Sequence, residues 1–168
     1  MREYYSITEL TREFDISTRF IELAGEINAS MPHYVVDKLA RSLDERAGRG
    51  LRGAKILMIG IAYKKNVEDI RESPAFKLIE LLEERGASVD FYDPYVQKIP
   101  STRKHPKLAG RPSIAWAPKT IGGYDAVLIA TDHDNIDYRT LVEQAALVID
   151  TRNACARAGM TSPKVVKA

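Results

Sequence analysis

Four cationic side chains of this sequence lie where a folded domain can use them to bind an anion. Lys64 and Lys65 come directly after a short apolar run that reads as a buried strand, and Arg152 comes after another. Arg71 lies just before a Ser-Pro pair that is typical of a helix start. Because helix starts also offer free N–H groups, the set is suited to a phosphate or carboxylate.

The two lysines have an ordinary alternative role as solvated loop residues. Lys64 is the stronger candidate for an anion ligand, because a strand end and a capped helix lie close to it in the sequence. Lys65 has the weaker case and can simply point outward. Tyr63, next to Lys64, can stack on a base or sugar, or it can close an edge of the core.

The two arginines also have structural alternatives. Arg71 can pair with a neighbouring carboxylate, or it can reach out of the domain to a phosphate group. Arg152 can grip phosphate or sugar oxygens, or it can form a salt bridge at a strand end. The carboxylates available are Asp69 and Glu72 for Arg71, and Asp132 and Asp150 for Arg152.

Other chemistries find little support in the sequence. His133 follows a strand, where a histidine is more often a hydrogen-bonded structural group than a base. Cys155 lies in a polar tail with no obvious base beside it, and no His/Cys/Asp spacing suggests a metal site. The G-x-G-x-x-G spacing is absent from residues 60–65, so we do not expect this sheet to bind NAD in the usual way.

The bulk composition is that of a soluble globular protein. The chain has 168 residues, 45% of them apolar and 29% charged. Its net charge of +2 is too small to indicate a nucleic-acid or membrane surface, and no apolar run is long enough to span a bilayer. A single cysteine excludes an internal disulfide and fits a reducing cytoplasm. We expect a cytoplasmic protein with no nucleic-acid or membrane partner.

Residues 18–47 predict one long helix, because apolar residues recur at helical spacing from Phe20 to Leu43. Pro32 lies inside it and is expected to bend its axis. At about 1.5 Å per residue the helix would be roughly 45 Å long, more than a small domain needs. We interpret it as a connector between domains, a dimer surface, or both.

The rest of the chain alternates between strands and helices, which predicts an α/β fold with a doubly wound, mostly parallel sheet. Ligands of such sheets bind outside the carboxyl ends of the strands, where the polar residues of this sequence gather. The expected strands are 55–60, 89–93, 125–130 and 147–150, with a short strand at 113–116 and an edge at 165–166. The expected helices are 74–85 and 138–144, with a turn at 119–123 and an irregular tail after Arg152.

Two segments resemble the signature of the UDP-glucose/GDP-mannose dehydrogenase family. They are Gly60-Ile61-Ala62-Tyr63-Lys64 and Asp69-Ile70-Arg71-Glu72-Ser73-Pro74. Further matches follow in the family's order: Tyr92-Asp93-Pro94, Thr131-Asp132-His133 and Ile149-Asp150-Thr151-Arg152-Asn153. The long helix resembles the family's central helix, and its sequence looks closest to the branch that oxidises UDP-N-acetylhexosamines.

The resemblance implies a three-part enzyme of which this chain is the second half. Residues 1–50 would be the remnant of a central dimerisation region, and residues 51–168 a Rossmann-like UDP-binding domain. The NAD-binding domain and the catalytic cysteine would precede Met1, whereas the C-terminus looks complete. The chain would therefore form a homodimer through its long helix and would be inactive alone.

The resemblance also implies roles for particular residues. Tyr63, Lys64 and Arg152 would contact a UDP-sugar, and Arg71 would reach NAD held mainly by the missing domain. The parent reaction would oxidise the sugar C6 alcohol to a carboxylate in two hydride transfers, for polysaccharide biosynthesis.

Two readings from other classes stay open. One is a non-catalytic dimerising or regulatory nucleotide-binding module, paired through the long helix. The other is a small response-type module, for which Asp93 and Asp132 at strand ends would be the acidic residues. The lack of paired acidic residues after the first strand argues against the second.

Overall fold

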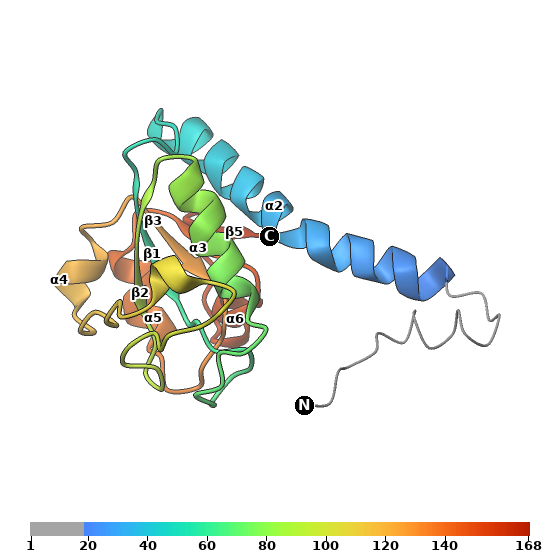
Figure 1. Ribbon diagram of the computed structural model, residues 1–168. Helices are drawn as coiled ribbons and strands as arrows, with labels where there is room; N and C mark the ends of the chain where they lie inside the picture. The colour runs from blue at the N-terminus through green and yellow to red at the C-terminus, as the bar shows by residue number, and fades with distance from the viewer. Residues whose placement is uncertain (1–18) are drawn as a thin grey trace, which may run out of the picture. The chain divides into compact units, whose positions relative to one another are not determined.

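The computed structural model describes residues 19–168. Figure 1 shows their helices and strands, coloured from the N-terminus to the C-terminus. A small helix predicted to begin near Tyr4 lies outside the described residues. The chain divides after Pro32, and residues 33–168 form one compact unit that contains the whole sheet. The four residues for which the resemblance implies binding roles, Tyr63, Lys64, Arg71 and Arg152, belong to this unit.

The predicted long helix is confirmed as α2 (Arg19–Ala47), which continues through Pro32. In its second half Leu39 and Leu43 are fully buried in the core of the sheet unit. The compact unit therefore begins at His33, before the domain boundary expected after residue 50, because these leucines complete the core. The functional division at that boundary stays a prediction.

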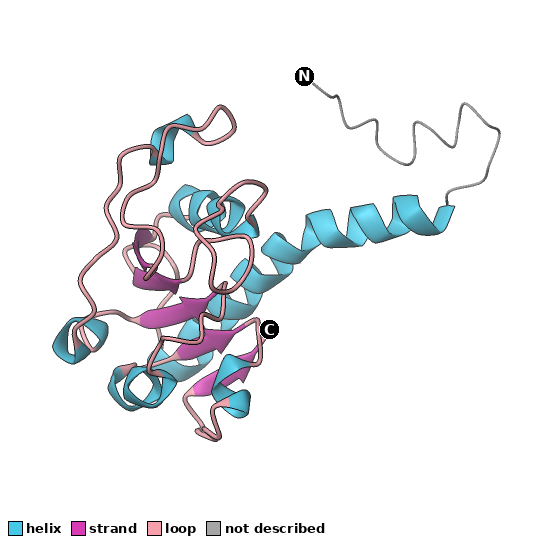
Figure 2. Ribbon diagram, turned by 90° about the horizontal axis from the view of Figure 1, so that it is seen from below, coloured by secondary structure: helices cyan, strands magenta, loops and turns pink. Residues whose placement is uncertain are grey.

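Five parallel strands form one sheet in the order β2-β1-β3-β4-β5, and Figure 2 shows them side by side. Their bounds are β1 (Lys55–Ile59), β2 (Ser88–Tyr92), β3 (Ala126–Ile129), β4 (Val148–Asp150) and β5 (Val165–Lys167). The predicted doubly wound α/β fold with a long helix before the sheet is confirmed. The edge expected at residues 165–166 is β5.

Helices cover both faces of the sheet, and the sequence of β1 shows why they must (Figure 2). Ile56 and Met58 pack into the core that contains α2 and α3, whereas Leu57 and Ile59 pack into the core on the opposite face. Successive side chains of a strand point to opposite faces, so a continuous apolar run needs cover on both. The remaining helices are α3 (Pro74–Glu84), η1 (Pro106–Leu108), α4 (Pro118–Ile121), α5 (Tyr138–Gln144) and α6 (Ala154–Arg157).

Helix α3 begins where the sequence predicts it. The Ser73 side chain accepts a hydrogen bond from the Ala75 backbone N–H at 3.3 Å, and Pro74 is the first helical residue. Its buried residues are Ala75, Phe76, Leu78, Ile79, Leu81 and Leu82. The helix is followed by Gly86, whose φ of +87° is the left-handed conformation that favours glycine.

Two local predictions are wrong. Residues 113–116 do not form a strand: the Ile114 N–H donates one hydrogen bond to the Phe91 carbonyl at 2.8 Å, but no repeating ladder follows. The tail after Arg152 is not irregular either, because α6 begins two residues later. The turn expected at residues 119–123 overlaps α4.

The strand order reverses between β1 and β3, so their carboxyl ends frame the crevice where such sheets bind ligands. The two ends touch. A Cβ atom on Gly60, whose φ is +75°, would lie 2.3 Å from the carbonyl oxygen of Thr131. Thr131 Oγ1 also donates a hydrogen bond to the Ala62 carbonyl at 2.6 Å. This contact fixes the path of the loop after β1, and therefore the position of Lys64.

Candidate functional site

Cationic side chains from the loop after β1 and the segment after β4 line one hollow at the carboxyl edge of the sheet. The hollow, which we call the basic hollow, has a volume of about 630 Å³. Its lining residues are Lys64, Lys65, Asp132, Thr151, Arg152 and Arg157. Four cations thus face a single carboxylate, and the excess positive charge favours an anionic ligand.

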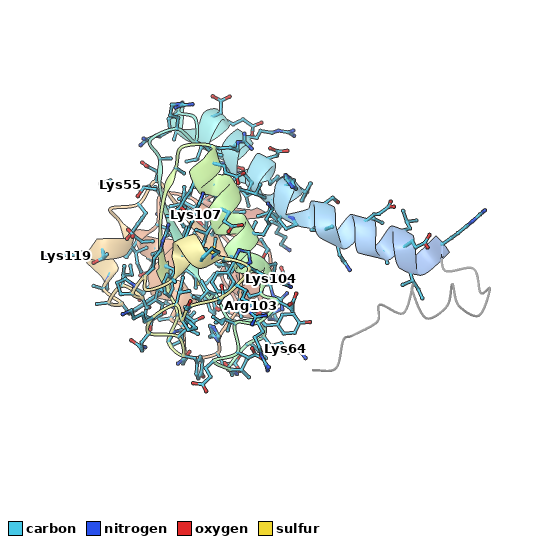
Figure 3. The ribbon with its side chains drawn as sticks, in the orientation of Figure 1. Lys55, Lys64, Arg103, Lys104, Lys107 and Lys119 are labelled. Carbon is cyan, nitrogen blue, oxygen red and sulfur yellow. The ribbon has the colours of Figure 1, made fainter. Side chains whose placement is uncertain are left out.

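The two lysines of this hollow differ in their partners. Lys65 Nζ forms an ion pair with Asp134, at 3.1 Å and 3.3 Å from the two carboxylate oxygens. Lys64 forms no ion pair within residues 19–168, and its Nζ lies 5.5 Å from the centre of the Tyr63 ring. Figure 3 shows Lys64 at the surface, below Arg103 in that view. Lys64 is therefore the lysine whose charge is available to a ligand.

Arg152 combines the two roles that the sequence left open. Its Nε donates to Asp132 Oδ1 at 3.1 Å, which is the predicted salt bridge at a strand end. Its side chain is nonetheless 48% exposed, and its two Nη groups make no hydrogen bond to the described part of the chain. The salt bridge therefore orients the guanidinium and leaves its terminal donors for a ligand.

Asp150 holds the backbone that carries Arg152. Its Oδ1 accepts the N–H groups of Arg152 and Ala154 at 2.9 Å and 3.1 Å, and its Oδ2 accepts that of Cys155 at 2.9 Å. Between them Asn153 takes a φ of +57°, a left-handed conformation that asparagine tolerates better than most residues. The buried carboxylate thus starts α6 directly after β4.

Asp93 does the same for the loop that carries Lys64. Its Oδ2 accepts the N–H groups of Ile61 and Ala62 at 2.7 Å and 3.1 Å, and its Oδ1 accepts two further backbone N–H groups just after β2. The His133 Nε2 lies 3.1 Å from the same Oδ2. Burial acts to raise the pKa of the Asp93 carboxyl, but the hydrogen bonds from His133 and the backbone outweigh burial and lower it.

His133 is a structural group, as the sequence favours. Its side chain is fully buried, and its Nδ1 accepts the Asn66 backbone N–H at 2.9 Å. The ring proton consequently belongs on Nε2, from which it is donated to Asp93. Both ring nitrogens are occupied by these bonds, so His133 joins the loops after β1, β2 and β3 rather than acting as a base.

Arg71 lines a different hollow from Lys64 and Arg152. This second hollow has a volume of about 620 Å³ and lies between residues 68–71 and residues 95–100. Arg71 pairs with Asp69 through Nε and Nη2, both at 2.9 Å, and these hydrogen bonds hold the pKa of Asp69 at about 2. The local pairing that the sequence allows is therefore present, although the Arg71 side chain is 86% exposed. The first turn of α3 lines neither hollow.

Most backbone N–H groups of the loop after β1 are already used within the chain. A dinucleotide-binding turn of this kind offers free backbone N–H groups to phosphate oxygens. Here the N–H groups of Ile61, Ala62, Tyr63 and Asn66 all donate to acceptors within the chain. Most backbone donors of this loop are therefore already used, and side chains supply most of the donors that an anion can find at this edge.

Within residues 19–168 the remaining chemical groups form no nucleophile or metal site. The Cys155 thiol is buried, and burial together with Asp150 raises its pKa to about 12, so it is not the reactive thiolate of a nucleophile. Among residues 19–168 no three His, Cys, Asp or Glu side chains are placed to hold a metal ion. In the same range no helix has the length and apolar content needed to cross a membrane.

Sequence reasoning missed Arg157, which the structure brings into the basic hollow. Arg157 lies on α6, in the tail that was expected to be irregular. The available signal was Asp150, because an aspartate at a strand end followed by Asn153 and three helix-compatible residues can nucleate a turn.

Comparison with known proteins identifies a matching domain. A profile described as "UDP-glucose/GDP-mannose dehydrogenase family, UDP binding domain" matches residues 57–157. This range contains every residue that lines the basic hollow.

Individual relatives agree with the profile. A UDP-N-acetyl-D-mannosamine dehydrogenase of Methanococcus maripaludis is 34% identical over 145 residues, which are 82% of this chain and 31% of the relative. An NDP-N-acetyl-D-galactosaminuronic acid dehydrogenase of Ralstonia nicotianae is 29% identical over 156 residues, 90% of this chain and 32% of the relative. The chain spans about a third of the length of the curated relatives it matches.

A solved structure shares the fold. The UDP-D-ManNAc dehydrogenase from Pyrococcus horikoshii superposes with a TM-score of 0.69 at 27% identity, over 90% of this chain and 34% of that one. The likeness again covers about a third of the larger protein.

Proposed function

The chain belongs to the UDP-glucose/GDP-mannose dehydrogenase family, and we propose that its basic hollow binds the UDP part of a nucleotide sugar. The observation that carries the proposal is that Lys64 and Arg152, from separate strand ends, line one hollow in which each keeps donors for a ligand. Such a pair suits a diphosphate, because an ammonium and a guanidinium can each bind phosphate oxygens with charge-assisted hydrogen bonds.

The proposal assigns roles to four residues. Lys64 and Arg152 bind phosphate oxygens, and Tyr63 contacts the nucleotide sugar beside Lys64. Arg71, in the other hollow, contacts an NAD held by protein outside these 168 residues. When bound there, NAD would supply the hydride acceptor for oxidation of the sugar C6 alcohol to a carboxylate.

Under this proposal the chain contributes the substrate-binding wall of a 6-dehydrogenase and is inactive alone. The relatives that carry N-acetylhexosamine names support an N-acetylated sugar as the substrate class. A cytoplasmic role in polysaccharide biosynthesis follows from the resemblance, and Cys155 as a buried free thiol is compatible with that reducing compartment.

Isothermal titration of the purified chain with UDP tests the proposal. We expect saturable binding, weakened about tenfold or more by Lys64→Ala and by Arg152→Ala, since each removes charge-assisted hydrogen bonds to phosphate. Lys119→Ala is the matched control, because Lys119 lies on α4 and lines neither hollow. Figure 3 places Lys119 on the far side of the unit from Lys64 in that view.

Absence of UDP binding at millimolar concentration would overturn the proposal. Equal losses in the Lys64 and Lys119 variants would also count against it, because they would show a general charge effect. Inorganic pyrophosphate as a second titrant separates the phosphate contribution from that of the nucleoside.

A second candidate function is a dimerising module without catalysis. Leu23, Ile27 and Met31 recur every fourth residue on α2, and each is between 41% and 52% exposed. An apolar stripe of this kind is typical of a helix that packs against a partner. Analytical ultracentrifugation tests the homodimer that we propose through α2: a monomer at micromolar concentration would exclude it, and a dimer that does not bind UDP would favour this second function.

A further inference from the structure

Two arginines share one carboxylate at the wall of the basic hollow. Arg152 Nε donates to Asp132 Oδ1 at 3.1 Å, and Arg157 Nη2 donates to Asp132 Oδ2. Arg157 Nη1 also donates to the backbone carbonyl of Arg152 at 2.8 Å. Arg157 is thus connected to Arg152 twice, once through the backbone and once through Asp132.

The two guanidinium groups use their donors differently. Both terminal nitrogens of Arg157 are bound to acceptors of the chain. Arg152 uses only its Nε, and within residues 19–168 its terminal nitrogens have no hydrogen-bond acceptor. The two terminal nitrogens of a planar guanidinium can bind two oxygens of one phosphate group. Arg152 therefore has donors available for a phosphate group.

Asp132 poses a problem that Arg157 solves. Its side chain is only 8% exposed and it lines a hollow that we propose for a diphosphate, so its negative charge would repel the ligand. With Oδ2 unoccupied, Asp132 could also take Arg152 in a two-bond pair that consumes a terminal nitrogen. Arg157 on Oδ2 places a second positive charge beside this carboxylate and keeps Arg152 to a single bond.

We propose that Arg157 is a positioning residue that keeps the terminal donors of Arg152 available for the diphosphate, and that it acts through Asp132. The inference rests on the proposed function, since it concerns the same hollow. It assigns Arg157 no direct contact with the ligand, because each of its terminal nitrogens already donates a hydrogen bond that holds Asp132 or the Arg152 backbone.

A double-substitution experiment tests the route through Asp132. The affinity of the 168-residue chain for UDP is measured by calorimetry for Arg157→Gln, for Asp132→Asn and for both together. We expect Arg157→Gln to weaken binding about tenfold alone but less than about twofold in the Asp132→Asn background, where no carboxylate remains to capture Arg152. A merely structural role of Arg157 would not produce this coupling.

Two further variants control for charge and folding. Arg139→Gln makes the same chemical change at an exposed arginine of α5 outside the basic hollow, and is expected to leave affinity within about twofold. Arg157→Lys keeps the charge but has a single terminal nitrogen, so we expect an intermediate loss of about threefold. If Arg157→Gln fails to fold, the lysine variant carries the same comparison.

The outcomes distinguish this inference from the proposed function. Unchanged UDP affinity in Arg157→Gln would overturn the inference and leave the function standing. Equal losses with and without the Asp132 carboxylate would show a direct contact between Arg157 and the ligand, and would overturn the positioning role. A chain that binds no UDP at all would overturn both.

Discussion

Asp93 and Asp132 are two buried aspartates that follow β2 and β3, the strands on either side of β1, yet their partners differ in kind. Asp93 accepts four backbone N–H groups and the buried His133 ring. Asp132 accepts two arginine side chains that are about half exposed. A carboxylate that satisfies backbone donors fixes the chain itself, whereas one that satisfies arginines fixes where surface charge points. Asp93 therefore fixes the backbone around the basic hollow, and Asp132 orients the arginine side chains that line it.

The largest expected effect is on folding stability. Asp93→Ala leaves buried backbone donors without an acceptor, so we expect the free energy of unfolding to fall by about 3–5 kcal/mol. Asp132→Ala is expected to cost about 1 kcal/mol, because its arginine partners can turn to water. Urea denaturation of both variants, followed by circular dichroism, measures the difference. Equal losses would break the distinction between the two aspartates.

Alanine substitutions at Gly60 and Gly159 test how tightly the ends of β1 and β3 pack together. Gly60→Ala places a Cβ 2.3 Å from the Thr131 carbonyl oxygen at a φ of +75°, so we expect destabilisation of about 2–4 kcal/mol. Gly159 has a similar φ of +71° but nothing within 4 Å of the added Cβ. Gly159→Ala is therefore expected to cost only about 1 kcal/mol, the cost of the backbone conformation.

Denaturation curves for the two alanine variants supply the test. The excess loss in Gly60→Ala reports the clash between the ends of β1 and β3 alone. If both variants lose the same stability, the close approach at Thr131 does not constrain the loop that carries Lys64.

The fold could be predicted from the sequence because its signals are local. Short continuous apolar runs marked the central strands, and Ser73-Pro74 marked the start of α3. The strand predicted at residues 113–116 is absent, although their composition suits a strand. A strand also needs a neighbouring strand to pair with, and a short stretch of sequence does not reveal that partner. The segment after β4 was predicted to be irregular because it has no periodic apolar pattern. Helix α6 forms there because the Asp150 carboxylate accepts the N–H groups of its first residues.

The site could be predicted only in part. Strand ends identified Lys64 and Arg152, and the structure brings them to one hollow. Which carboxylate pairs with Arg152 depends on the distance between β3 and β4, which the sequence does not contain. Arg157 needed both that distance and the position of α6, and the only signal along the chain was the turn that Asp150 and Asn153 can nucleate.

Acid titration sharpens the same comparison through the pKa of Asp93. The folded state lowers this pKa, so the unfolded state takes up the proton first as the pH falls. The stabilisation from Asp93 is therefore complete above the ordinary aspartate pKa of about 4 and is lost as the pH falls through the folded value. Asp93→Asn should flatten the loss of stability as the pH falls below about 5. An unchanged slope would show that other carboxylates control it.

The smallest expected effect distinguishes the two lysines on the site side. Lys65 is paired with the exposed Asp134, whereas Lys64 has no carboxylate partner within residues 19–168. Lys65→Ala removes a charge that is already compensated and screened, so UDP affinity should change less than about threefold, and less still at high salt. Lys64→Ala should keep its larger loss at high salt, because a direct bond to phosphate is screened less than a distant charge. Calorimetry at two salt concentrations measures both. A Lys65 loss that equals the Lys64 loss would mean that UDP binding depends on the summed charge of the hollow and not on the donors that the strand ends position.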